Sequence, residues 1–79
     1  MKAYDRFVAC VDASLIASRE VCKRDDLVKA GQIYEGACAE YVRVQAKQPQ
    51  MVSQARLLID AASAEVSNAE RRVRWLSVS

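Results

Sequence analysis

The segment VSQARLLIDAASAEVSNAERRVRWL, residues 52–76, is the strongest indicator of the fold expected of this chain. Small or apolar residues recur in it every three or four positions, so they form one stripe along a helix. Valine or isoleucine alternates on the stripe with alanine, until leucine takes the last alanine position. The stripe consists of Val52, Ala55, Ile59, Ala62, Val66, Ala69, Val73 and Leu76. Its alanines allow a neighbouring helix to come close, provided that this helix places large side chains over them.

A second stripe with the complementary pattern lies upstream. It consists of Leu27, Ala30, Tyr34, Ala37, Tyr41 and Val44. If the two segments fold antiparallel around Gln48, Tyr41 faces Ala55 and Tyr34 faces Ala62, so large residues lie over small ones. Pro49 supports a turn over residues 45–50, because proline cannot continue a helix but fits the start of the next one. The sequence therefore predicts an all-α fold built on an antiparallel helical hairpin, with helices at about 27–46 and 50–77.

The N-terminal segment predicts another helix, at about 3–23. Its stripe is Tyr4, Val8, Val11, Leu15, Ser18 and Cys22, and Phe7 and Ile16 widen the same face. The pattern changes register at residues 23–26, where Asp25 or Asp26 is expected to cap the following helix. A break or kink is favoured there, with the first helix completing a three-helix bundle. The alternative is that it extends the second helix.

Glycines inside the second stripe leave two interpretations open. Gly31 and Gly36 each disfavour a helix interior. Gly31 could mark a kink or a frayed start, or it could form, with Cys38, a shallow groove where a third helix approaches.

Composition limits the function classes. The 79 residues suit a single domain, and one proline and two glycines are too few for a β-rich fold. Twelve basic and ten acidic residues are interspersed, a balance that does not favour nucleic-acid binding. The start of the chain shows no signal peptide, and no apolar run suffices for a membrane span, so a cytoplasmic protein is expected.

Catalytic and cofactor chemistry is not expected. The chain has no histidine to serve as base for a cysteine or serine nucleophile. Its cysteines, Cys10, Cys22 and Cys38, show no Cys-x-x-Cys spacing, so neither a disulfide framework nor a metal site is indicated. We therefore expect no enzyme activity, no cofactor, no metal and no small-molecule substrate.

Protein binding is the function that the residues favour, with a helical surface of another protein, or a second copy in a homodimer, as partner. The candidate contact residues come from the wide first stripe and from the end of the last helix. They are Tyr4, Phe7, Val8, Val11, Leu15, Ile16, Arg71, Arg72, Arg74 and Trp75. The three arginines and Trp75 could also contact phosphates and stack a base, as in an RNA-binding helical homodimer. Cations near a helix C-terminus are better explained by the helix dipole.

Several short runs add a family likeness. They are Ser18-Arg19-Glu20, Pro49-Gln50, Leu57-Leu58-Ile59-Asp60-Ala61, Ala64-Glu65-Val66 and Trp75. In these runs the chain resembles the small E-type components of type III secretion systems, which are cytoplasmic helical hairpins of similar length. The resemblance implies a co-chaperone that acts with a larger helical-repeat chaperone to keep the needle-forming subunit monomeric. The register change at Asp25 and the two glycines depart from the family pattern. A phage or mobile-element inhibitor of a host complex is the alternative.

Overall fold

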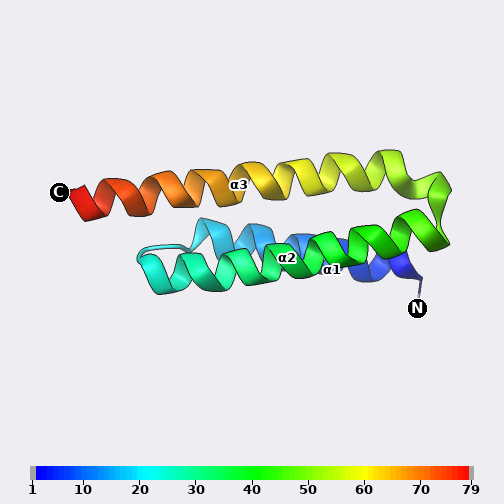
Figure 1. Cartoon of the computed structure of the whole chain (residues 1–79), viewed down its shortest axis with the longest axis horizontal. Coiled ribbons are helices and arrows are strands. Elements are labelled where there is room, and N and C mark those ends of the chain that lie inside the picture. Colours follow the sequence, from blue (N-terminus) through cyan, green and yellow to red (C-terminus); the bar gives the residue numbers. More distant parts are fainter. Residues whose placement is uncertain (1, 79) are drawn as a thin grey trace.

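The computed structural model describes residues 2–78 and contains three long helices. Helix α1 spans Ala3–Arg19, α2 spans Arg24–Lys47 and α3 spans Val52–Val78. A short 3₁₀ turn, η1 (Pro49–Met51), connects α2 to α3. The helices lie side by side in an elongated bundle with extents of 46 × 19 × 14 Å (Figure 1). The expected all-α hairpin is confirmed, and α1 folds back against it to complete a three-helix bundle.

The two stripes predicted for the hairpin meet in the interior. All five of their interior alanines are fully buried: Ala30, Ala37, Ala55, Ala62 and Ala69. Tyr34 and Tyr41 are half-buried and pack against the main core cluster, as expected of large side chains over alanines. The turn also follows the prediction, because Pro49 occupies the first position of η1, directly after Gln48.

Helix α1 contributes one large side chain to the core that it forms with the hairpin. Phe7 is fully buried, and its ring lies 5.9 Å from the Tyr41 ring, centroid to centroid. The inner face of α1 is completed by Val11, Ser14 and Ser18, which are also buried. Two of these are serines, and such small side chains let α1 approach the other helices closely.

This inner face corrects the stripe expected for the first helix. The expected stripe was centred on Tyr4, Val8 and Leu15, but these residues are half-buried at its edge. The predicted member Cys22 is exposed, because α1 ends at Arg19 and Cys22 belongs to the loop. The register shift follows from Phe7, whose ring has the greatest apolar area to bury among the candidates on this helix.

The start of α2 also differs from expectation. The helix begins at Arg24 with Lys23 as N-cap, so Asp25 and Asp26 lie in the first turn and do not cap it themselves. Oδ2 of Asp26 instead accepts a hydrogen bond from the backbone N–H of Cys22, at 3.2 Å. Carboxylates in the first turn are favoured by the helix dipole in either arrangement.

The glycines of α2 have no steric role. A Cβ atom built on Gly31 or Gly36 would meet nothing within 4 Å among the described residues. Helix α2 runs without a break past both positions. The frayed start considered at Gly31 is therefore not observed, and no third helix among the described residues comes close to Gly31.

Candidate partner-binding surface

The candidate residues of α1 are mostly used inside the bundle. Phe7 and Val11 have no exposed surface, and Tyr4, Val8 and Leu15 are half-buried against the core. Ile16 is different, because 56% of its surface is exposed. The folded-back position of α1 thus leaves Ile16 as the large apolar side chain that α1 offers to a partner.

Arg72 serves as a cap for α1. Its Nη1 atom donates to the backbone carbonyl oxygens of Arg19 and Val21, each at 3.1 Å, and lies 3.5 Å from that of Ser18. The last carbonyls of a helix have no intrahelical partner, so a cation at this point satisfies them and complements the helix dipole. Nε of Arg19 on α1 also lies 3.8 Å from Oε2 of Glu65 on α3, so a weaker ion pair joins the same two helices.

The other two arginines differ from Arg72. Nη2 of Arg71 donates to Oδ1 of Asn68 at 2.6 Å, and both residues are exposed on the outside of α3. Arg74 lines a shallow cavity of about 330 Å³ together with Glu70 on α3 and Arg24 and Leu27 on α2. The structure therefore does not bring the three arginines together as one basic site.

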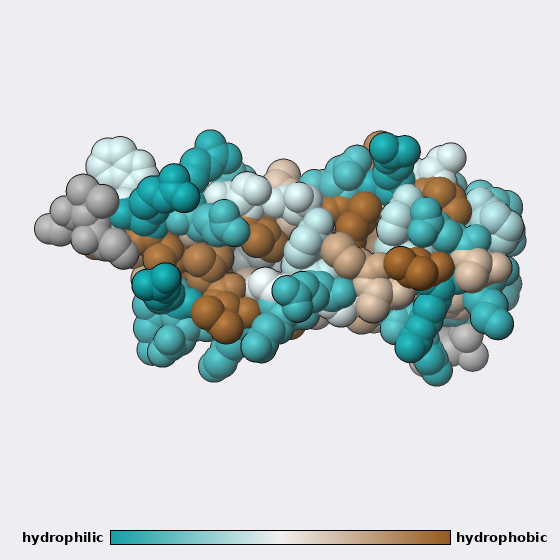
Figure 2. Space-filling model, viewed as in Figure 1, coloured by the Kyte–Doolittle hydropathy of each residue, from teal (hydrophilic) through white to brown (hydrophobic). Residues whose placement is uncertain are grey.

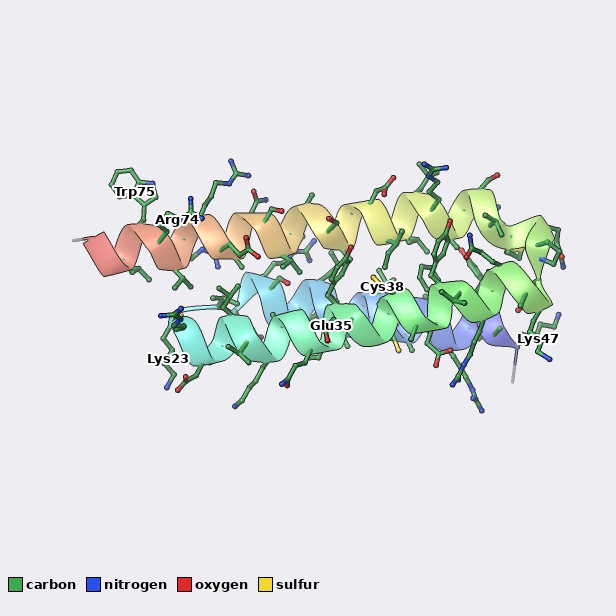
Figure 3. All side chains as sticks on the ribbon, viewed as in Figure 1. Lys23, Glu35, Cys38, Lys47, Arg74 and Trp75 are labelled. Carbon is green, nitrogen blue, oxygen red and sulfur yellow. The ribbon has the colours of Figure 1, made fainter. Side chains whose placement is uncertain are left out.

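The outside of α3 carries a second set of residues at helical spacing. Counted by threes and fours, the set is Leu57, Ala61, Ala64, Asn68, Arg71 and Trp75, which we call the outer stripe. All six residues are exposed and lie on the side of α3 opposite its buried alanines. Leu57 and Trp75 are 73% and 76% exposed, and Trp75 points away from α1 and α2 (Figure 3).

The outer stripe has a large apolar side chain at each end and small alanine side chains at its centre, so its centre is lower than its ends. Leu57 and Trp75 are roughly 27 Å apart along the helix, at a rise of 1.5 Å per residue. Ala61 and Ala64 lie between them and project little beyond the backbone. Sequence reasoning identified Trp75 but missed the stripe, although its signal was a second three-and-four spacing out of phase with the buried one.

Other exposed apolar residues are scattered. Val28 and Val42 on α2 are 54% and 61% exposed. On the face shown in Figure 2, apolar residues gather where α2 and α3 meet, and hydrophilic residues cover the outer edges. Single exposed apolar residues are common on any protein and do not indicate a binding site.

Tyr34 is the titratable group whose environment departs most clearly from that of a free side chain. A hydrogen bond with Ser63 lowers the pKa of Tyr34, whereas burial, a hydrogen bond with Cys38 and the charges of Cys38 and Asp60 raise it. The raising effects prevail, so the pKa of Tyr34 lies above its ordinary value. The contact with Ser63 also places Tyr34 beside the Ala62–Ser63 segment of α3, as the hairpin register predicts.

The described residues provide neither a metal site nor a disulfide. Within residues 2–78, no three histidine, cysteine or acidic side chains form a group that could hold a metal ion. Cys10 and Cys38 are half-buried free thiols, and Cys22 is an exposed one. None of the described helices combines the length and the apolar content that a membrane crossing needs.

Comparisons with known proteins found no matching family model, no matching curated protein and no matching solved structure.

Proposed function

We propose that this chain is a small, non-enzymatic protein-binding module whose contact surface is the outer stripe of α3. The observation that carries the proposal is the exposure of Leu57 and Trp75 at the two ends of one helical stripe. Trp is among the residues that most often dominate the energy of protein interfaces. Burying both side chains against a partner removes apolar surface from water, at about 25 cal/mol per Å².

The shape of the stripe specifies the partner. Because Ala61 and Ala64 leave a low centre, the complementary surface must be a helix with large apolar side chains at its middle. Arg71 lies on the stripe, so an acidic residue on the partner helix would pair with it. The partner that fits is an amphipathic helix with a bulky centre and an acidic end.

Among known activities, we favour that of a type III secretion co-chaperone acting in the cytoplasm. Leu57, Ala61, Ala64 and Trp75 belong both to the outer stripe and to the runs that carry the resemblance to the E-type components. In this role the stripe would bind the larger helical-repeat chaperone or the needle-forming subunit. A phage or mobile-element inhibitor would use the same surface against a host complex.

RNA binding is less well supported. It requires several arginines in one place, whereas Arg72 caps α1 and Arg74 borders a cavity on the α2 side. Arg71 on the outer stripe is then left to contact phosphates next to Trp75, which is little positive charge for a nucleic-acid site.

The test is co-expression with the needle subunit and the helical-repeat chaperone of the same secretion system, followed by size-exclusion chromatography. We expect a heterocomplex, which the double substitution Leu57→Asp with Trp75→Asp abolishes while circular dichroism stays unchanged. Val42→Asp, at an exposed apolar residue of α2, is the matched control and should retain the complex. Elution of the chain alone, or equal loss with the control, would refute the co-chaperone proposal. Sedimentation of the chain alone tests whether the occupant of the stripe is a second copy.

A further inference from the structure

A cavity lies at the end of the bundle where the start of α1 meets the turn between α2 and α3. It has a volume of about 520 Å³. Lys2 and Arg6 line it from the α1 side, Arg43 and Lys47 from α2, and Gln48 from the turn. Figure 1 shows the N-terminus beside this turn, and Figure 3 labels Lys47 at the same end. The cavity therefore brings together cationic side chains from both ends of the first 47 residues.

The charge around this cavity is unbalanced. Its lining holds four cationic side chains and one carboxylate, that of Glu40, so its formal net charge is +3. The whole chain has a formal net charge of +2, so all the remaining residues together contribute −1. Repulsion among four cations around one cavity is relieved when an anion enters it.

Glu40 holds one of the cations in place. Oε1 of Glu40 accepts a hydrogen bond from Nη1 of Arg43 at 3.0 Å. Oε2 of Glu40 is buried and has no hydrogen-bond partner among the described residues. The pair holds the guanidinium of Arg43 at the cavity, and the carboxylate offsets one of the four positive charges.

The backbone adds to the attraction for an anion. Helix α1 begins at Ala3, in the wall of this cavity. Its N-cap residue Lys2 makes no side-chain capping hydrogen bond, and the N–H of Tyr4 donates to Oε1 of Gln48. A lysine at this point opposes the positive end of the helix dipole, whereas an anion complements it. The four cationic side chains and the dipole thus favour the same kind of ligand.

We infer that this cavity binds a small, multiply charged oxyanion of the phosphate class, with inorganic pyrophosphate as the probe. Four cations match several negative charges better than one, and guanidinium groups bind phosphate oxygens in pairs. The lining contains no aromatic ring for a nucleobase, so a compact phosphate compound fits better than a nucleotide. This ligand departs from the sequence-based expectation of no small molecule.

The test is isothermal titration of the full chain with pyrophosphate at low and moderate salt. We expect saturable binding that weakens as the salt concentration rises. Arg6→Gln or Lys47→Gln should each weaken binding roughly tenfold, because each removes about one charged contact to the ligand. Lys23→Gln is the charge-matched control, because Lys23 lies at the other end of α2 from Lys47 (Figure 3). It should bind as the unmodified chain does.

Three outcomes would overturn the inference: no saturable binding, equal loss in the control, or unchanged affinity in both cavity variants. A parallel titration with a short single-stranded RNA shows whether the cavity prefers the phosphates of a nucleic-acid backbone to a free phosphate compound. If the chain binds RNA but does not bind pyrophosphate, the inference is also contradicted. The double variant at Leu57 and Trp75 should keep pyrophosphate binding, which separates this result from the test of the outer stripe.

Discussion

The guanidinium Nη1 of Arg72 lies 3.1 Å from the backbone carbonyl oxygen of Val21, which is 51 residues away in the sequence. The same atom also donates to the carbonyl of Arg19 at the end of α1. At the opposite end of α1, the backbone N–H of Tyr4 donates to Oε1 of Gln48 at 2.7 Å. Both termini of α1 are therefore capped by side chains from distant parts of the chain, which fixes α1 against the hairpin.

Substitution of Arg72 should loosen the C-terminal end of α1. Arg72→Gln is expected to lower the free energy of unfolding by about 1–2 kcal/mol, because the carbonyls lose a charged donor at a partly exposed site. Urea denaturation measures the change. Arg71→Gln is the matched control, since Arg71 bonds to Asn68 on its own helix, and should change stability by less than about 0.5 kcal/mol. Equal effects of the two substitutions would argue against the cap.

Substitution of Gln48 tests the other end of α1. Gln48→Ala should lower the free energy of unfolding by about 1 kcal/mol, because the N–H of Tyr4 loses its acceptor. Gln48→Glu should restore stability or exceed it, since a carboxylate both accepts this bond and complements the helix dipole. Thermal denaturation of both variants, with Gln50→Ala as control, provides the measurement. A stable Gln48→Ala variant would show that the bond contributes nothing.

Replacement of the α2 glycines should stabilise the protein. Gly31→Ala and Gly36→Ala are each expected to raise the free energy of unfolding by about 0.5–1 kcal/mol, because alanine favours the helix. No described atom opposes the new methyl group at either position. Ala39→Gly, at an exposed position of the same helix, should cause a loss of similar size. Destabilisation by either alanine would mean that the glycines have a steric role.

High pH should destabilise the fold through Tyr34. Its pKa is raised in the folded chain, so the unfolded chain releases this proton first as the pH rises. The associated stability is complete below about pH 10, the ordinary tyrosine value, and is lost as the pH rises through the folded pKa. Urea denaturation at a series of alkaline pH values should show a shallower decline for Tyr34→Phe than for the unmodified chain. An unchanged decline would contradict the assignment.

The hairpin could be predicted from the sequence because its determinants are local and periodic. Alternating alanines such as Ala37 and Ala62 indicate both the buried faces and their relative alignment. Pro49 locates the turn. The register of α1 could not be obtained in this way, because Phe7 and Val8 compete for the interior. The spaces left by two other helices decide between them.

Much of the candidate site depends on long-range contacts that no local pattern contains. Arg72 looks like a surface arginine in the sequence, and its role as a cap depends on where α1 ends. Phe7 and Val11 look like partner contacts until α1 folds back over the hairpin. The three-and-four spacing of the outer stripe is visible in the sequence. It indicates a contact surface because the structure exposes Leu57 and Trp75.

Site-specific photo-crosslinking tests whether the outer stripe contacts a partner. Benzoylphenylalanine is placed at Ala64, in cells that contain the complete secretion system. Ala64 lies at the centre of the outer stripe, and Val42 on α2 is the matched exposed control. We expect a covalent adduct from Ala64, with the needle subunit or its helical-repeat chaperone, and none from Val42. The absence of an adduct at Ala64, or the same adduct from both positions, would contradict it.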